Sequence, residues 1–238
     1  MGPGTYARRI AGSWLIGAST AIVILGASIA PFLAPPVVRF EQDRAQVRAW
    51  TGYDAAELDT VTGALLGDLV LWRGDFDVAV DGIPALGEAE RSHMRDVRSV
   101  FAGFWLAVLG GVAVLALVAR RSRGDVAARA AAWRAIGAGA RTLAVLIAVV
   151  GVFSLVAFDA AFELFHRLFF SGNYTFDPAT DKLVQLFPMA FWSEVAMAVG
   201  ATVIVMSIAV AWLAGRRASG ASAASPASAQ AAALDGAA

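Results

Sequence analysis

The sequence contains two histidines, His93 and His166, and no cysteine in 238 residues. An imidazole has an ordinary pKa of about 6.5, so at neutral pH it can take a proton from a nucleophile and return one to a leaving group. Each histidine has carboxylates at helical spacing: Glu90 and Asp96 stand three residues on either side of His93, and Glu163 stands three residues before His166. This pattern predicts an acid–base pair among other ionisable side chains.

Other chemistries fit these residues less well. Two histidines with neighbouring acids could bind a metal, but no closely spaced HExxH-type motif is present, so we expect no metal site. A serine nucleophile is disfavoured because there is no GxSxG motif, and Ser92 points to a different helix face from its neighbour His93. Acids at helix ends often only mark a membrane interface, and a lone histidine there is more often structural, so this plainer interpretation stays open for each residue.

The histidines belong to a chain that is 58% hydrophobic. Its apolar residues form continuous blocks, each long enough to cross a hydrocarbon layer of about 30 Å. The first block contains a stretch, Ser28 to Ala30, that resembles a signal-peptide cleavage site, but its length and the following Pro31 favour an uncleaved anchor. We therefore predict an all-α membrane protein, a four-transmembrane-helix bundle with a small extracytoplasmic cap. The blocks are Ile10–Leu33, Val100–Ala119, Thr142–Phe158 and Val195–Ala214.

The distribution of charge predicts the orientation of these spans. The N-terminus, the loop from Arg120 to Arg141 and the C-terminal tail hold 10 of the 19 basic residues but only two acids, Asp125 and Asp235. Basic residues concentrate on the cytoplasmic side of membrane proteins. Both termini are therefore predicted to be cytoplasmic, in a plasma membrane, and the remaining loops face outward without a basic cluster that would suggest nucleic-acid binding.

These observations divide the chain into eight segments. Residues 1–38 form the cytoplasmic N-terminus and first transmembrane helix, 39–99 an extracytoplasmic cap, 100–119 the second transmembrane helix and 120–141 a basic cytoplasmic loop. Residues 142–162 form the third transmembrane helix, 163–188 an extracytoplasmic loop, 189–214 the fourth transmembrane helix and 215–238 a disordered Ala/Ser-rich cytoplasmic tail.

Local patterns predict the elements of the cap. The stretch after Asp54 has apolar residues at helical spacing, with Asp54 as N-cap, and predicts an amphipathic helix. "DFDVAVDG" alternates with period two and ends in a turn-forming Asp81-Gly82, which predicts a short strand or hairpin. No helix breaker interrupts Glu88 to Ala119, so one long helix is expected there, and Asp181 is expected to cap another.

Counting along continuous helices compares the depths of the histidines. His93 lies 27 residues before Arg120, roughly 40 Å along a helix axis. His166 lies 25 residues after Arg141, roughly 37 Å. The two imidazoles are therefore predicted at one level, just outside the hydrocarbon. Ionisable residues at such a depth are candidates for a functional site.

Two segments resemble a known family. "ERSHMRDVRSVF" and "FHRLFFSGNYTFDPATDKLVQLFPMAFW" resemble the signature segments of the bacterial lipoprotein intramolecular transacylases, the Lit family. The resemblance implies transfer of the sn-2 acyl chain of a diacylglyceryl-cysteine lipoprotein to the cysteine α-amine, giving an N-acyl S-monoacylglyceryl, or lyso-form, lipoprotein. It places the two essential histidines of the family at His93 and His166. No cofactor is expected, because amine and ester belong to one molecule.

Under this interpretation the neighbouring residues have expected roles. One histidine acts as base and the other as donor, and which does which is left open. The loop "NYTFDPATDK" is expected to limit water. The supporting or orienting residues are Asp96, Glu163, Asn173 as an oxyanion donor, and Asp181. The substrate-binding residues are Arg98, Phe169, Phe170, Phe191, Trp192 and Glu194, although the aromatic ones could instead form an interfacial belt.

The expected partners are diacylglyceryl-modified lipoproteins and membrane lipids, with the protein acting as a monomer. Two alternatives remain. One is a non-enzymatic membrane sensor or assembly protein in which the histidine pair responds to pH. The other is a different membrane lipid acyltransferase or lipase that uses the same pair.

Overall fold

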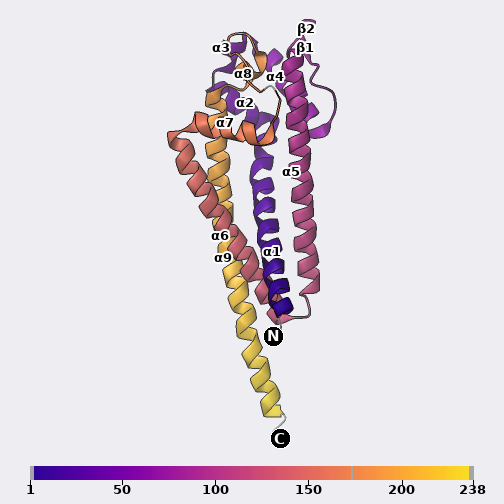
Figure 1. Ribbon diagram of the computed structural model, residues 1–238, viewed down its shortest axis with the longest axis vertical. Coiled ribbons are helices and arrows are strands. Elements are labelled where there is room, and N and C mark those ends of the chain that lie inside the picture. Colours follow the sequence, from indigo (N-terminus) through magenta and orange to yellow (C-terminus); the bar gives the residue numbers. More distant parts are fainter. Residues whose placement is uncertain (1–2, 173, 236–238) are drawn as a thin grey trace. The chain divides into compact units, whose positions relative to one another are not determined.

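The computed structural model describes residues 3–172 and 174–235, and the side chains of residues 12–172 and 174–220. Four helices in this part of the chain are long and apolar enough to cross a membrane, as predicted. Their apolar side chains point outward: Leu106, Val149 and Val205 are each more than 60% exposed, which suits a lipid environment. The chain is a mainly helical membrane protein. The four helices are α1 (Pro3–Ile29), α5 (Glu88–Arg121), α6 (Val126–Val156) and α9 (Met189–Asp235) (Figure 1).

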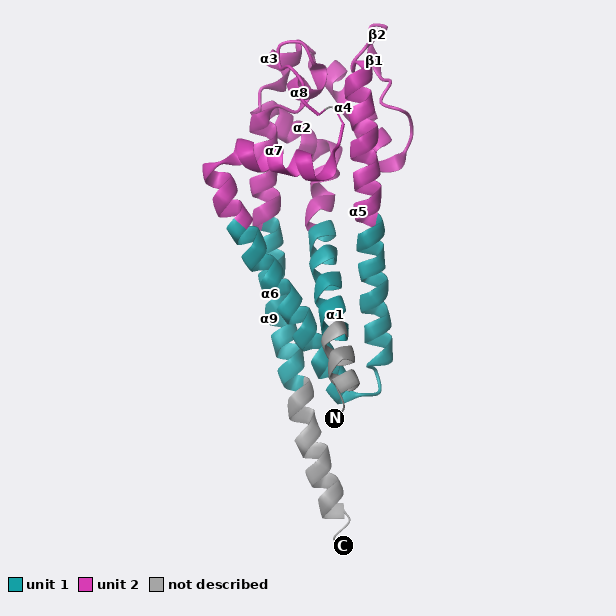
Figure 2. Ribbon diagram, in the orientation of Figure 1, with its two compact units in different colours: residues 1–27, 106–149, 202–238 teal, residues 28–105, 150–201 magenta. Residues whose placement is uncertain are grey.

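The chain folds into two compact units (Figure 2). Unit 1 comprises residues 1–27, 106–149 and 202–238, and unit 2 comprises residues 28–105 and 150–201. Each of the four long helices contributes residues to both units. Both histidines belong to unit 2.

Unit 1 is built on close contacts between helices. A Cβ atom added to Gly139 of α6 would lie 2.5 Å from the Cα atom of Gly17 in α1, and one added to Gly111 of α5 would lie 3.1 Å from the carbonyl oxygen of Ser19. Apolar side chains gain little by leaving lipid for a helix interface, so membrane helices associate where small residues let backbones approach. The glycines therefore set this packing.

The basic loop predicted over residues 120–141 is wrong in extent. Helix α6 already begins at Val126, so most of this segment is helical and only residues 122–125 connect α5 to α6. The Asp125 carboxylate accepts a hydrogen bond of 2.9 Å from the backbone N–H of Ala128 and caps the new helix. At the other end, α9 continues past Ala214. The disorder predicted for residues 215–238 is therefore wrong for residues 215–235, which belong to this helix, and residues 236–238 lie outside the described residues.

Short helices and one hairpin make up the cap in unit 2. Helix α4 matches the predicted amphipathic helix: the Asp54 carboxylate accepts hydrogen bonds from the backbone of Ala56 and Glu57, and Glu57 bonds back to Asp54, which forms a capping box. Two short helices before it were not predicted. The elements are η1 (Ala30–Leu33), α2 (Pro35–Arg44), α3 (Val47–Thr51), α4 (Ala55–Leu71), β1 (Ala79–Val80), β2 (Ile83–Pro84), α7 (Phe158–Phe169) and α8 (Lys182–Leu186).

The predicted hairpin is confirmed. Strands β1 and β2 pair antiparallel, with Val80 opposite Ile83. Asp81 and Gly82 between them have φ angles of 50° and 77°. Positive φ at both central residues is the geometry of a type I′ turn, whose twist matches that of the paired strands.

The cap has its own hydrophobic core, which joins segments far apart in the sequence. It includes Val47 of α3, Val61 and Leu65 of α4, Phe76 of the following loop and Leu186 of α8, none more than 2% exposed. The buried Gln42 amide donates to the Leu186 carbonyl (3.2 Å) and so satisfies two polar groups within this core. The loop before α9 is therefore held against the segment that precedes α5.

The predicted third transmembrane helix does not continue to His166. Helix α6 ends at Val156, Ala157 leaves the helical region with φ −142° and ψ 56°, and α7 starts in a new direction (Figure 1). Counting helical rise from Arg141 to His166 was therefore wrong as geometry, because it assumed one straight helix. His166 therefore lies near His93 because of the direction of the separate helix α7, and not because of its height on a straight transmembrane helix.

Candidate active site

The two imidazoles lie side by side in unit 2. His93 belongs to the charged first part of α5, and His166 belongs to α7. Their ring centroids are 6.1 Å apart and their planes are inclined by only 23°. His93 is 8% exposed and His166 is half-buried. The site therefore has one shielded and one more accessible imidazole.

One hydrogen bond determines which nitrogen of His166 is available for chemistry. The Nδ1 atom lies 2.8 Å from the backbone carbonyl oxygen of Phe162, one turn earlier in α7. A carbonyl oxygen can only accept, so Nδ1 carries the proton and donates. In the neutral ring Nε2 then has a free lone pair and can act as a base.

Aromatic rings surround the pair. The ring of Phe170 lies 4.9 Å from His93 and 5.5 Å from His166, and is itself 8% exposed. Phe176 lies 5.6 Å from His93, and Phe162 and Tyr174 lie 4.2 and 5.4 Å from His166. These walls fix ring orientation and exclude water, which strengthens local electrostatic interactions.

The predicted orienting acids contact the histidines less directly than expected. The Glu163 carboxylate accepts from Arg167 (2.8 Å) and from the Tyr174 hydroxyl (3.4 Å), so it holds Tyr174, which in turn packs against His166. Asp96 is exposed, one turn after His93. Burial lowers the pKa of His93, the charge of His166 lowers it further, and the Asp96 carboxylate only partly opposes this shift. Asn173 lies outside the described residues.

Two other predicted residues have structural roles. Arg98 donates to the Gly74 carbonyl (2.9 Å) and pairs with Asp75, and its guanidinium stacks over Trp72 and Phe76. These contacts hold the loop after α4. Asp181 occupies the N-cap position of α8, but its carboxylate accepts from the backbone N–H of Asp177 (2.7 Å) and orders the preceding turn.

The four aromatic residues predicted to bind acyl chains separate into different environments. Phe170 belongs to the histidine cluster described above. Phe169 is 52% exposed and packs on Phe165. Phe191 is buried in the cap core, while Trp192 is partly exposed and its ring lies 6.2 Å from Phe162. Trp192 therefore connects to the cluster through one intermediate ring.

Glu194 belongs to a charged group that sequence reasoning missed. Arg44 donates to its carboxylate at 2.6 Å. Glu41 lies in the same group, and its Oε2 atom is buried without a hydrogen-bond donor. Burial raises the pKa of Glu41, the Glu194 carboxylate raises it further and Arg44 opposes this. The group lines a groove of about 380 Å³, and no spacing in the sequence signalled it because α2 and α9 are far apart along the chain.

Within the described residues, no group of three or more His, Cys, Asp or Glu side chains is placed to hold a metal ion. The arrangement instead offers two imidazoles in an aromatic enclosure, one with a defined free nitrogen. It can take a proton at one position and deliver one nearby, which suits acyl transfer between oxygen and nitrogen.

Comparisons with known proteins identify the relatives of this chain. The family described as lipoprotein intramolecular transacylase Lit matches residues 14–192. Three in meso crystal structures of the membrane-integral lipoprotein intramolecular transacylase Lit from Bacillus cereus have the same fold, two of them of histidine variants. All are 18% identical in sequence, with TM-scores of 0.63 to 0.64, and they cover 89–90% of this chain and 93–96% of their own. A comparison with curated protein sequences gave no match.

Proposed function

Because the chain belongs to the Lit family of lipoprotein intramolecular transacylases, we propose that it moves the sn-2 acyl chain of a diacylglyceryl-cysteine lipoprotein to the cysteine α-amine. The single observation that carries this proposal is the pair of imidazoles, 6.1 Å apart, in which His166 has a free Nε2. The lipoprotein substrate and membrane lipids are the partners.

The geometry supports distinct roles for the two histidines. His166 takes a proton from the α-amine as its nitrogen attacks the ester carbonyl and forms the C–N bond. His93 donates a ring N–H hydrogen bond to the oxyanion and passes a proton to the glyceryl oxygen as the C–O bond breaks. The α-amine has then lost one proton to His166, and the glyceryl oxygen has gained one from His93. Transfer of a proton from His166 to His93 restores the starting state of both rings.

The aromatic enclosure supports transfer over hydrolysis. Phe170 contacts both rings and Phe176 covers His93, so little water has access to the reacting carbonyl. The α-amine belongs to the same molecule as the ester, and its effective concentration is therefore high. Both histidines come from one chain, so we propose that a monomer is sufficient.

The test is mass spectrometry of the N-terminal peptide of a reporter lipoprotein, produced in a host that lacks N-acylation. Wild-type protein is expected to convert the diacylglyceryl peptide into an isobaric species with one acyl chain on nitrogen, and His93→Ala and His166→Ala are expected not to. Loss of an acyl chain as free fatty acid would indicate a lipase instead. An unchanged diacylglyceryl peptide with wild type would favour a sensor or assembly protein.

We further propose that both termini are cytoplasmic and that the histidine pair faces outward, on the strength of the charge distribution. The cysteine-free sequence allows a direct test with single cysteines at the exposed positions Ala56 of unit 2 and Gly124 of unit 1. A membrane-impermeant maleimide added to intact cells should label Ala56→Cys and leave Gly124→Cys unlabelled until the cells are lysed. The opposite labelling pattern would overturn the orientation.

A further inference from the structure

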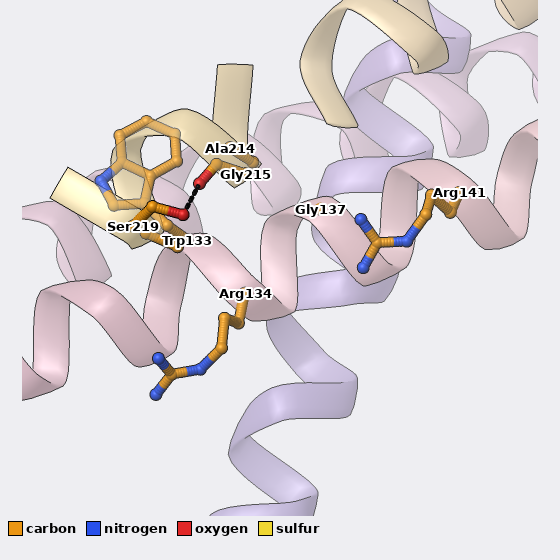
Figure 3. Close-up of a pocket in the computed structure, with 8 residues that line it drawn as sticks. Trp133, Arg134, Gly137, Arg141, Ala214, Gly215 and Ser219 are labelled. Carbon is orange, nitrogen blue, oxygen red and sulfur yellow. Dashed lines mark hydrogen bonds between the residues drawn. The ribbon is translucent and has the colours of Figure 1, made fainter. Parts of the chain in front are cut away.

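A second cavity, of about 500 Å³, lies in unit 1 between α6 and α9 and contains neither histidine (Figure 3). Arg134, Arg141 and Trp133 line it on α6, and Gly215 and Ser219 line it on α9. The Ser219 hydroxyl donates within its own helix to the Gly215 carbonyl (3.1 Å). The two guanidinium groups are therefore the charged donors that this cavity offers to a ligand, beside the indole N–H of Trp133.

The hollow exists because small residues line it. Gly137 lies one turn after Trp133 on the wall formed by α6, and a Cβ atom added there would lie 3.3 Å from both the Ala214 side chain and an Arg141 guanidinium nitrogen. A Cβ atom added to Gly215 would meet nothing within 4 Å. Larger side chains at these positions would occupy the space.

The charge around the cavity is unbalanced. Unit 1 contains ten arginines and only two acids, Asp125 and Asp235, and the Asp125 carboxylate already caps α6. Arg134 and Arg141 are exposed and stand seven residues apart on α6. That spacing puts them on one helix face, about 10 Å apart along the axis. Positive charge therefore far exceeds negative charge in the unit that holds these two guanidinium groups.

We propose that this cavity binds the headgroup of an anionic phospholipid. Guanidinium groups recognise phosphate oxygens through paired hydrogen bonds, and basic pockets between membrane helices bind such headgroups. The neighbouring surface favours a lipid over free phosphate: Val145 stands four residues after Arg141 on the same face of α6 at 63% exposure, and Ile208 stands seven residues before Gly215 on the same face of α9 at 59% exposure. These apolar side chains can contact acyl chains while the arginines bind the phosphate, with the Trp133 indole at the boundary between them.

Arginines are expected anywhere on the cytoplasmic side of a membrane protein. The test must therefore separate binding in the cavity from general electrostatic attraction between basic residues and anionic lipid. Purified full-length protein in neutral detergent is titrated with phosphatidylglycerol, and binding is followed by thermal shift. Arg134→Gln/Arg141→Gln should weaken the apparent affinity about 10- to 30-fold. The control Arg120→Gln/Arg121→Gln removes the same charge from exposed positions outside the cavity and should change affinity less than threefold.

A second variant keeps every charge. In Gly215→Leu the new Cβ atom meets nothing within 4 Å, and the leucine side chain should weaken binding at least fivefold by occupying the cavity. Equal weakening by the two arginine pairs, or no effect of Gly215→Leu, would reduce the proposal to a general electrostatic attraction and overturn it. Glycerol phosphate, which has the headgroup phosphate but no acyl chains, should bind far more weakly than the lipid. If it binds as tightly, the ligand is a soluble phosphate and the lipid proposal is wrong.

Discussion

The assignment of His166 as the base can be tested by replacing its two ring nitrogens separately. In His166→Asn the side-chain amide nitrogen occupies nearly the position of Nδ1 and can still donate to the Phe162 carbonyl, which now lies 2.8 Å from that nitrogen. No atom remains at the Nε2 position. In His166→Gln the amide reaches the Nε2 position, but its oxygen is not a useful base at neutral pH.

Both variants should therefore lose the base while differing in what else they retain. Removal of a positioned general base lowers rates about 10²- to 10⁴-fold, equivalent to about 2.7 to 5.5 kcal/mol in the activation free energy. His166→Asn keeps its backbone partner and His166 is only half-buried, so the free energy of unfolding should fall by about 1 kcal/mol or less. A large activity loss with a small stability loss is the expected signature.

The assay is the initial rate of N-acyl product formation on a diacylglyceryl reporter peptide, together with the melting temperature of each purified variant. Phe165→Leu is the matched control, because Phe165 touches the edge of the His166 ring (5.5 Å) yet is 48% exposed. Its rate should stay within threefold of wild type. A His166→Asn rate within tenfold of wild type, in a folded protein, would refute the assignment and transfer the role of base to His93.

Three further predictions concern stability. Glu41 has a raised pKa in the folded protein. Its contribution to stability is therefore complete below its ordinary pKa of 4.5 and is lost as the pH rises through the raised value. Glu41→Gln should flatten this decline in melting temperature between pH 4 and 8. Asp54→Ala removes the cap of α4 and should cost about 1 kcal/mol in the free energy of unfolding, whereas Asp54→Asn should cost little. Gly139→Ala puts a methyl group 2.5 Å from Gly17 Cα and should lower the melting temperature sharply, whereas Gly103→Ala, in open space, should not.

The four spans, the capping of α4 and the hairpin turn could be predicted because each depends on neighbours in sequence. A continuous apolar block specifies a helix long enough for a membrane whatever packs beside it. The Asp54 cap involves only the next three residues, and the turn needs only Asp81 and Gly82. In such elements the stabilising contacts join residues that are close together in the sequence, so the local sequence pattern is enough to predict them.

The break at Ala157 was beyond the same reasoning. Val156 and Phe158 are apolar, and no glycine or proline marks the point where α6 ends and α7 begins. The direction of α7 depends instead on contacts with the cap. Helix α6 also begins earlier than predicted. The arginines between residues 120 and 141 suggested a cytoplasmic loop, but the buried Gly137 and Gly139 of this segment permit close helix packing.

The amino-acid sequence by itself determined that this protein has two imidazoles, flanked by acids, on helices of an apolar chain. Only the tertiary structure decided what those groups contact. The Phe162 carbonyl sets the tautomer of His166, Glu163 acts through Tyr174, and Arg98 holds a loop. Residue types and periodicity restrict which face of a helix is polar, whereas the partner of each side chain depends on long-range packing among segments separated by many residues.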